Sequence, residues 1–141
     1  MRVRRHIVHH LAWVAVVSLP IVGGWGSVAA AQSMSPMRGE IKSFSDAFAL
    51  KVVPSNPYPH RIRMEVRVYD QDFHEISARV SPSEFALGSQ GSRPVTVVVP
   101  FDGDRMRKVR VCAESVPFPN GQTQIKAQIC GKFLARRLSP F

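Results

Sequence analysis

The sequence lacks the residue patterns that most enzymes and metal proteins need. It contains no Gly-x-Ser-x-Gly, no phosphate-binding loop and no His-Glu-x-x-His motif. After the first 31 residues it has two histidines, His60 and His74, which lie far apart and follow no metal-ligand spacing. We therefore expect a protein that is not an enzyme and that has no metal site and no cofactor.

Four acidic residues are the remaining candidates for a cation site. Asp70 and Asp72, and then Asp102 and Asp104, form two tight pairs beside expected turns. Carboxylate oxygens of this kind can bind calcium. Aspartate is also common in turns for local reasons, because its side chain accepts hydrogen bonds from the backbone. The turn interpretation is the one we adopt.

Cysteine is scarce, and the two that are present lie symmetrically about one turn. The midpoint between Cys112 and Cys130 is Gly121, inside a Pro- and Gly-containing segment. If the chain folds there as an antiparallel hairpin, the two cysteines face each other with Cβ atoms about 4.5–5.5 Å apart, close to disulfide geometry. The same register pairs other residues: Ala113 with Ile129, and Val111 with Gly131. We predict a disulfide, and hence an oxidising compartment.

The disulfide is expected to be structural. The chain has no Cys-x-x-Cys motif, which a redox-active pair would favour. Both cysteines have the parity of the polar face of their strands, so the bond is expected to join the outer side of the sheet.

Helical periodicity is missing as well, and alternation takes its place. Residues 61–69 alternate between charged and apolar side chains, as a half-buried strand does. Similar alternation occurs in 48–52, 95–99, 109–113 and 125–133, with one possible helical turn at 83–87. About seven short strands predict an all-β fold, a single immunoglobulin-like antiparallel β-sandwich.

The N-terminus has the layout of a signal peptide. Arg2, Arg4 and Arg5 precede an apolar stretch that is short for a membrane span, and small residues end at Ala31. We predict cleavage after Ala31, so that residues 1–31 are a signal peptide and residues 32–141 are one domain without a stable membrane span. An uncleaved anchor is the alternative. The protein is then periplasmic or secreted.

Acidic residues are few relative to basic ones. Of the 19 Lys and Arg residues three lie before position 32, so 16 remain against 10 acids and the net charge of residues 32–141 is +6. Aromatic residues are not interleaved with the basic ones, so we expect no nucleic-acid partner. If strand 61–69 shares a sheet with the hairpin, one outer face collects a set of cations: Arg61, Arg63, Arg67, Lys108, Arg110, Lys126 and Lys132. This basic face is either a docking surface or simply solvated.

Several passages together resemble one family. These passages are Val80-Ser81-Pro82-Ser83-Glu84-Phe85-Ala86-Leu87-Gly88, the following 91–97, then 109–117 and 123–137, and upstream the first-strand segment Met37-Arg38-Gly39-Glu40-Ile41. They resemble the N-terminal immunoglobulin-like domain of periplasmic pilus-assembly chaperones, the PapD-like proteins. Some members of that family also join the last two strands by a disulfide.

The resemblance implies a chaperone-like binding module for a protein partner in pilus or cell-surface assembly. In the family, a basic pair anchors the terminal carboxylate of a pilus subunit, while the last strand is added to the subunit's sheet. By position the basic pair is Arg38 and Lys132. The edge strand is expected over 123–133, with a set of apolar side chains toward the partner: Ile125, Ala127, Ile129 and Phe133.

A second function from a different class remains open. The domain can be a structural, envelope-associated protein whose basic sheet face binds anionic surfaces such as lipid or polysaccharide. Its binding would weaken steeply with salt.

Overall fold

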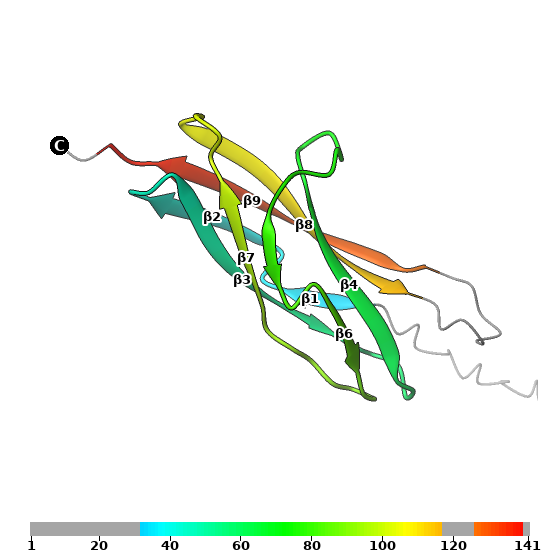
Figure 1. The fold of residues 1–141 in the computed structure, drawn as a ribbon. Helices are drawn as coiled ribbons and strands as arrows, with labels where there is room; N and C mark the ends of the chain where they lie inside the picture. Colours follow the sequence, from blue (N-terminus) through cyan, green and yellow to red (C-terminus); the bar gives the residue numbers. More distant parts are fainter. Residues whose placement is uncertain (1–31, 117–125, 140–141) are drawn as a thin grey trace, which may run out of the picture.

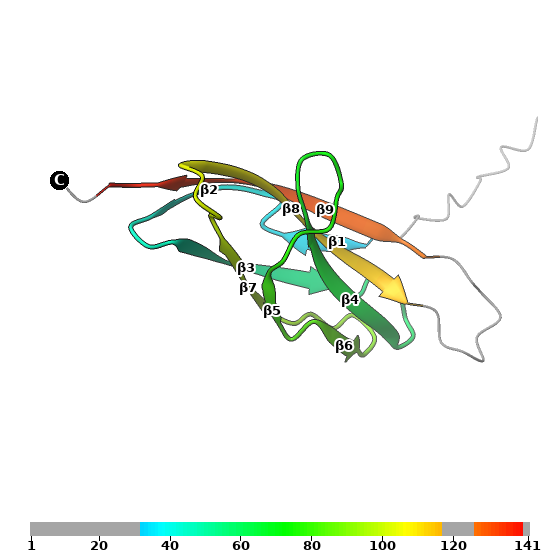
Figure 2. The same ribbon diagram turned by 45° about the horizontal axis from the view of Figure 1, so that its top comes forward.

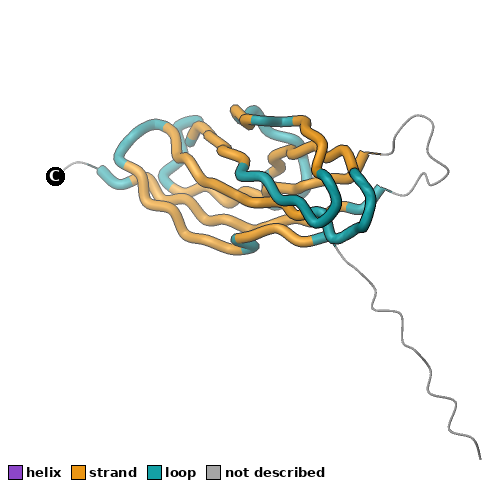
Figure 3. The backbone as a smooth tube through the Cα atoms, turned by 90° about the horizontal axis from the view of Figure 1, so that it is seen from below, coloured by secondary structure: helices purple, strands orange, loops and turns teal. Residues whose placement is uncertain are grey.

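Alternating apolar side chains build the strands of the structure, which is a computed structural model that describes residues 32–116 and 126–139. Nine strands form two sheets of four and five strands that pack face to face (Figures 1 and 3). The described residues contain no helix, and so none of the length and apolarity that crossing a membrane requires. The prediction of an all-β sandwich is confirmed.

The four-stranded sheet has the order β1-β3-β7-β5. Its strands are β1 (Ser33–Ser35), β3 (Ala47–Ser55), β7 (Val95–Pro100) and β5 (Arg79–Ser81). All three pairings in this sheet are antiparallel.

The five-stranded sheet has the order β2-β9-β8-β4-β6. Its strands are β2 (Arg38–Ser43), β9 (Gln128–Arg137), β8 (Met106–Val116), β4 (Ile62–Tyr69) and β6 (Glu84–Leu87). The expected helical turn at 83–87 is therefore wrong, because β6 pairs with β4 across Glu84–Leu87 and buries Phe85 and Leu87.

The hairpin of β8 and β9 has the register predicted from the cysteines. Cys112 lies opposite Cys130, and the two are joined by a disulfide with their Cα atoms 4.0 Å apart. The flanking pairs Ala113–Ile129 and Val111–Gly131 also occur as expected. The turn between the strands, including Gly121, lies outside the described residues.

The core lies between the sheets, as the period of two requires. In β4 the residues Ile62, Met64, Val66 and Val68 are buried and alternate with partly exposed ones. Each such side chain contributes about 1.5–3 kcal/mol by its removal from water. In the opposite sheet, β7 buries three valines: Val95, Val97 and Val99.

One strand pairing departs from the antiparallel prediction. The chain begins in the four-stranded sheet as β1, passes Pro36, and continues as β2 in the other sheet, where it runs parallel to β9. Because Pro36 has no N–H to donate, strand pairing is interrupted at the crossing. The first strand is thus divided between the two sheets, and β2 covers only the second half of β9.

Candidate partner-binding site

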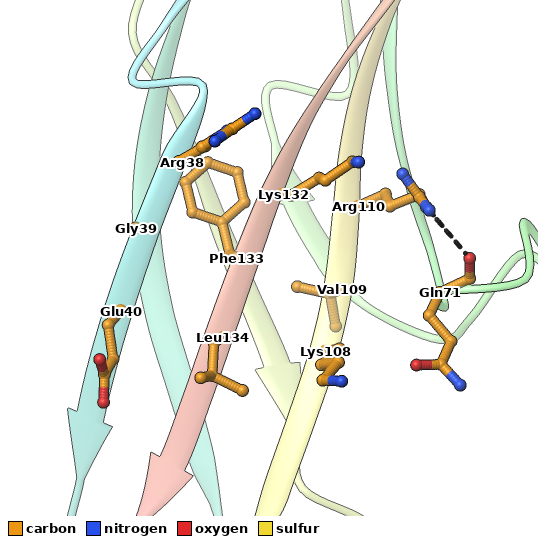
Figure 4. Close-up of a pocket in the computed structure, with 10 residues that line it drawn as sticks. All are labelled: Arg38, Gly39, Glu40, Gln71, Lys108, Val109, Arg110, Lys132, Phe133 and Leu134. Atoms are coloured by element: carbon orange, nitrogen blue, oxygen red, sulfur yellow. Dashed lines mark hydrogen bonds between the residues drawn. The ribbon is translucent and has the colours of Figure 1, made fainter.

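Three cations form a row across neighbouring strands of the five-stranded sheet. Arg38 in β2 lies opposite Lys132 in β9, and Lys132 lies opposite Arg110 in β8. Paired residues point to the same face, and neighbouring strands are about 4.7–4.9 Å apart. The three side chains therefore stand side by side on the outer face of the sheet (Figure 4).

The loop between β4 and β5 holds Arg110 in place. This loop rises above the outer face of the sheet (Figure 2). The Nε and Nη2 atoms of Arg110 donate hydrogen bonds to the backbone oxygen of Gln71, at 3.2 and 3.1 Å. The guanidinium also lies 4.3 Å from the ring centre of Phe73, a cation–π contact. Arg110 is fixed by contacts to the protein, while three of its five N–H donors remain available.

A depression of about 770 Å³ lies over this row. It is open to solvent on one side, with Gln71 at its wall and Leu134 in its floor (Figure 4). Lys108 and Glu40, which lie opposite Leu134 on the two neighbouring strands, complete its lining. Glu40 is engaged by the Nε atom of Arg136 at 2.8 Å. Within the part of the chain that the structure describes, the other four charged residues of the depression form no ion pair: Arg38, Lys108, Arg110 and Lys132.

The first half of β9 has an open edge beside this row. β2 pairs with β9 only from Lys132 onward, so no strand among residues 32–116 and 126–139 pairs with Gln128–Gly131 on that side, although Met34 of β1 lies close to Gly131. The Ser115 N–H donates to the Ala127 oxygen on the β8 side, and the Lys132 N–H donates to the Met37 oxygen on the other side. Because backbone groups alternate along a strand, Gln128 and Cys130 direct theirs toward the open edge.

The predicted edge strand is thus open over part of its length. Ile125 lies outside the described residues, while Ala127 and Ile129 are half-buried. Phe133 is only 4% exposed and belongs to the core, where its ring lies close to Gly131 and Gly39. From Lys132 onward β9 has a neighbour on both sides, so Phe133 is not available at the surface.

The predicted basic face is partly neutralised by neighbouring carboxylates. β4 does share its sheet with the hairpin, as expected. However, Arg63 pairs with Glu84 at 3.0 Å, and Arg67 pairs with Glu65 and Glu75 at 2.8 and 3.2 Å. The hydrogen bond to Glu65, together with the charges of Glu65 and Glu75, raises the pKa of Arg67 above its usual value. The Arg61 and Lys126 side chains are exposed near the ends of their strands.

Two of the four loop aspartates use their side-chain oxygens within the protein: Asp70, and Asp102, which accepts a hydrogen bond from Arg107. Asp70 Oδ1 accepts hydrogen bonds from the backbone N–H groups of His74 and Asp72, at 2.9 and 2.8 Å, and Oδ2 lies 3.2 Å from His74 Nδ1. The bond from the His74 backbone, followed by that from Asp72, lowers the pKa of Asp70. Across residues 32–116 and 126–139 no three His, Cys, Asp or Glu side chains gather as metal ligands.

Some residues that line the depression, or that contact Arg110 beside it, were not found from the sequence. Gln71 and Phe73 come from a loop whose position over the sheet no periodicity indicates. Leu134 was not identified as a site residue because only its parity on β9, which it shares with Lys132, places it on the outer face of the sheet. The pair of Arg38 and Lys132 was suggested by the family resemblance alone, and the parallel pairing of β2 with β9 that brings them together was not predicted.

Comparisons with known proteins identify the class of fold. No protein-family model matches the chain, and no curated protein matches it. Among solved structures, the Escherichia coli chaperone DraB is similar, with a TM-score of 0.62 and 19% identity over 76% of this chain and 55% of that one. The Salmonella enterica SafA pilin in complex with the SafB chaperone gives a TM-score of 0.62 and 20% identity over 76% and 54%.

One domain of a human protein is similar to this chain over almost the whole length of that domain. The PapD-like domain 7 of CEP192 gives a TM-score of 0.59 and 12% identity over 94% of this chain and 99% of that domain. The chain spans about half the length of the chaperone chains it matches. Its fold is a PapD-like, immunoglobulin-like sandwich, and the resemblance inferred from the sequence is confirmed.

Proposed function

We propose that this protein is an exported, periplasmic binding module of the chaperone type. It takes an extended segment of a protein partner onto the open edge of β9 and holds the segment's terminal carboxylate between Arg38 and Lys132. In this proposal residues 1–31 are a signal peptide, residues 32–141 are the working domain, and the protein has no catalytic role. Its setting is the assembly of pili or other cell-surface structures.

The observation that carries the proposal is the position of the open edge. The unpaired side of Gln128–Gly131 leads directly to the Arg38–Lys132 pair. A strand added there gains backbone hydrogen bonds from Gln128 and Cys130, and a carboxylate between two cations gains charge-assisted hydrogen bonds. A strand whose carboxyl end reaches Arg38 runs parallel to β9 and in line with β2.

The structural neighbours support a protein partner. Two of the similar structures are complexes of a chaperone with a subunit: SafB with the SafA pilin, and CsuC with the tip adhesion subunit CsuE. The alternative of a basic face that binds anionic surfaces receives less support, because Arg63 and Arg67 are paired with carboxylates.

Reversal of one charge tests the proposal. We expect Lys132→Glu to weaken binding of a fluorescent peptide, with alternating Val and Thr residues and a free carboxyl end, by at least tenfold. Because Lys132 is exposed and forms no ion pair with a described residue, the free energy of unfolding should change by less than about 0.5 kcal/mol. Fluorescence anisotropy and urea unfolding measure the two quantities.

The matched control is Lys51→Glu, since Lys51 is also exposed and lies in the other sheet; it should leave binding unchanged. Amide exchange at Gln128 and Cys130 should slow when the peptide binds. Equal binding of the free-acid and amidated peptides would exclude carboxylate capture, and unaltered exchange at both amides would exclude strand addition.

A further inference from the structure

The cations of the depression extend beyond the pair that the proposed function uses. Arg110 and Lys108 belong to β8, one strand further from the open edge than Lys132. From β2 to β8 the row Arg38–Lys132–Arg110 spans about 10 Å, twice the spacing of neighbouring strands. A single small anion contacts two adjacent members of such a row and leaves the third without a partner.

The guanidinium of Arg110 is already oriented by contacts within the protein, without a bound anion. Two of its N–H groups are fixed on the Gln71 oxygen, and its plane lies against Phe73, which is 52% exposed and adopts a left-handed backbone conformation with φ of 64°. This conformation is unusual for a bulky residue. A guanidinium held in this way loses less side-chain entropy when it binds a carboxylate than a free side chain does.

The floor of the depression has one apolar side chain beside the cations. Leu134 is half-buried between Glu40 and Lys108 in the row next to Lys132. It offers a contact for a short aliphatic chain that lies between two anionic groups. Glu40, the acid at the rim, is already paired with Arg136 and leaves the β8 side positive.

We infer that the site takes a partner whose last residue is acidic, so that the chain ends in two carboxylates. This inference rests on the proposed function and names the class of C-terminus that the site selects. The α-carboxylate lies between Arg38 and Lys132. The side-chain carboxylate of a terminal Glu or Asp reaches Arg110 and Lys108, and its methylene groups lie against Leu134.

Four isosteric peptides test the inference on the protein purified from the periplasm after expression of the full chain. They share one sequence of alternating Val and Thr and end in Glu or Gln, each as a free acid or an amide. We expect the Glu free acid to bind about tenfold more tightly than the Gln free acid, because the second carboxylate gains charge-assisted hydrogen bonds. Arg110→Gln should remove this difference, because it lowers the affinity for the Glu free acid more than the affinity for the Gln free acid.

Two further variants keep the test independent of the folding of Arg110→Gln. Lys108 is exposed, and Lys108→Gln should reduce the preference for Glu over Gln. Arg63→Gln is the matched control, because Arg63 lies on the same sheet face of β4 and is paired with Glu84; it should leave the preference intact.

The outcomes separate this inference from the proposed function. Equal affinity for the Glu and Gln free acids overturns the second carboxylate alone. Equal affinity for acids and amides overturns the proposed carboxylate capture. Displacement of the Glu free acid by inorganic phosphate or by phosphatidylglycerol vesicles at comparable concentrations also overturns the inference, because the cations would then serve a different anion.

Discussion

Gly131 allows β9 to approach the core closely. An added Cβ at this position would lie 2.9 Å from Phe133 Cε2 and 3.1 Å from Met34 Cε. The phenylalanine ring is buried and has little freedom to move, whereas the end of the methionine side chain can shift. Packing therefore requires a residue without a Cβ atom at this position, next to the edge that we propose to bind the partner.

We expect Gly131→Ala to lower the free energy of unfolding by about 1–3 kcal/mol, because a forced methyl group displaces packed side chains. Gly88→Ala is the control, since no atom lies within 4 Å of the added Cβ at that position. It should change stability by less than about 0.5 kcal/mol. Urea unfolding of both variants decides the matter, and equal effects would contradict the packing explanation.

At the residue scale, the buried side chain of Asn56 is satisfied by loop geometry that the sequence does not indicate. The Asn56 side chain is 1% exposed, and its Nδ2 donates to the backbone oxygens of His60 and Gly88, each at 2.8 Å. The Tyr58 N–H donates to Asn56 Oδ1 at 2.9 Å. Asn and Pro are residue types typical of turns, but the link of Asn56 to the β6–β7 loop requires the three-dimensional contacts.

At the scale of elements, the loop between β4 and β5 positions Arg110 and is itself organised by Asp70. The backbone hydrogen bonds from His74 and Asp72 stabilise the ionised carboxylate. They lower its pKa below the ordinary value of 3.8. The stabilisation is thus fully present above pH 3.8 and is lost as the pH falls through the lower folded-state pKa.

We therefore expect Asp70→Asn to destabilise the protein at pH 6 and to have progressively less effect below pH 3.8. Asparagine keeps an accepting oxygen but lacks the charge, so the difference from the wild type should shrink as Asp70 itself is protonated. Urea midpoints at pH 6, 4 and 2 measure it. Asp72→Asn is the control, since its side chain accepts no hydrogen bond from the described residues; a pH-independent effect of Asp70→Asn would contradict the argument.

The strands themselves differ in how well their sequences predict them. β4, β7 and the β8–β9 hairpin are visible as alternation, because each has one buried face. β6 was confused with a helical turn because four residues are too few to distinguish the two periods. The division between β1 and β2 has no periodicity signal, since it depends on which sheet is nearer after Pro36.

For the whole molecule, the disulfide joins the two longest strands of the five-stranded sheet, β8 and β9. Cys112 is fully buried although it lies on the outer face of the sheet. The two cysteines are separated by 18 positions, and closing a loop of this size in the unfolded chain contributes about 3 kcal/mol in the chain-entropy estimate.

We expect reduction with dithiothreitol to lower the free energy of unfolding by about 3 kcal/mol. The variant with Cys112→Ala and Cys130→Ala should show a similar loss and no further response to reductant. Urea unfolding with and without dithiothreitol measures both. Unchanged stability of the wild type after complete reduction, verified by thiol titration, would contradict the prediction.

Fold and site were therefore predictable to different degrees. The position of two cysteines fixed a register, and one-sided burial revealed the main strands. The cation row needed the pairing of β2 with β9, which joins residues almost a hundred positions apart. The depression also needed a loop above the sheet. Such contacts follow from the assembled sandwich and leave no local pattern in the chain.

The parallel placement of β2 has a consequence for what the edge of β9 can accept. Since β2 already occupies the line from Lys132 onward, a guest chain that continued past this point would collide with the host's own backbone. The unpaired edge of β9 therefore ends at Lys132, where β2 begins to pair with it. In the proposed function, such an edge would bind the C-terminal end of a polypeptide and not an internal segment of the same sequence, and the position of the bound chain would be set by its last residue.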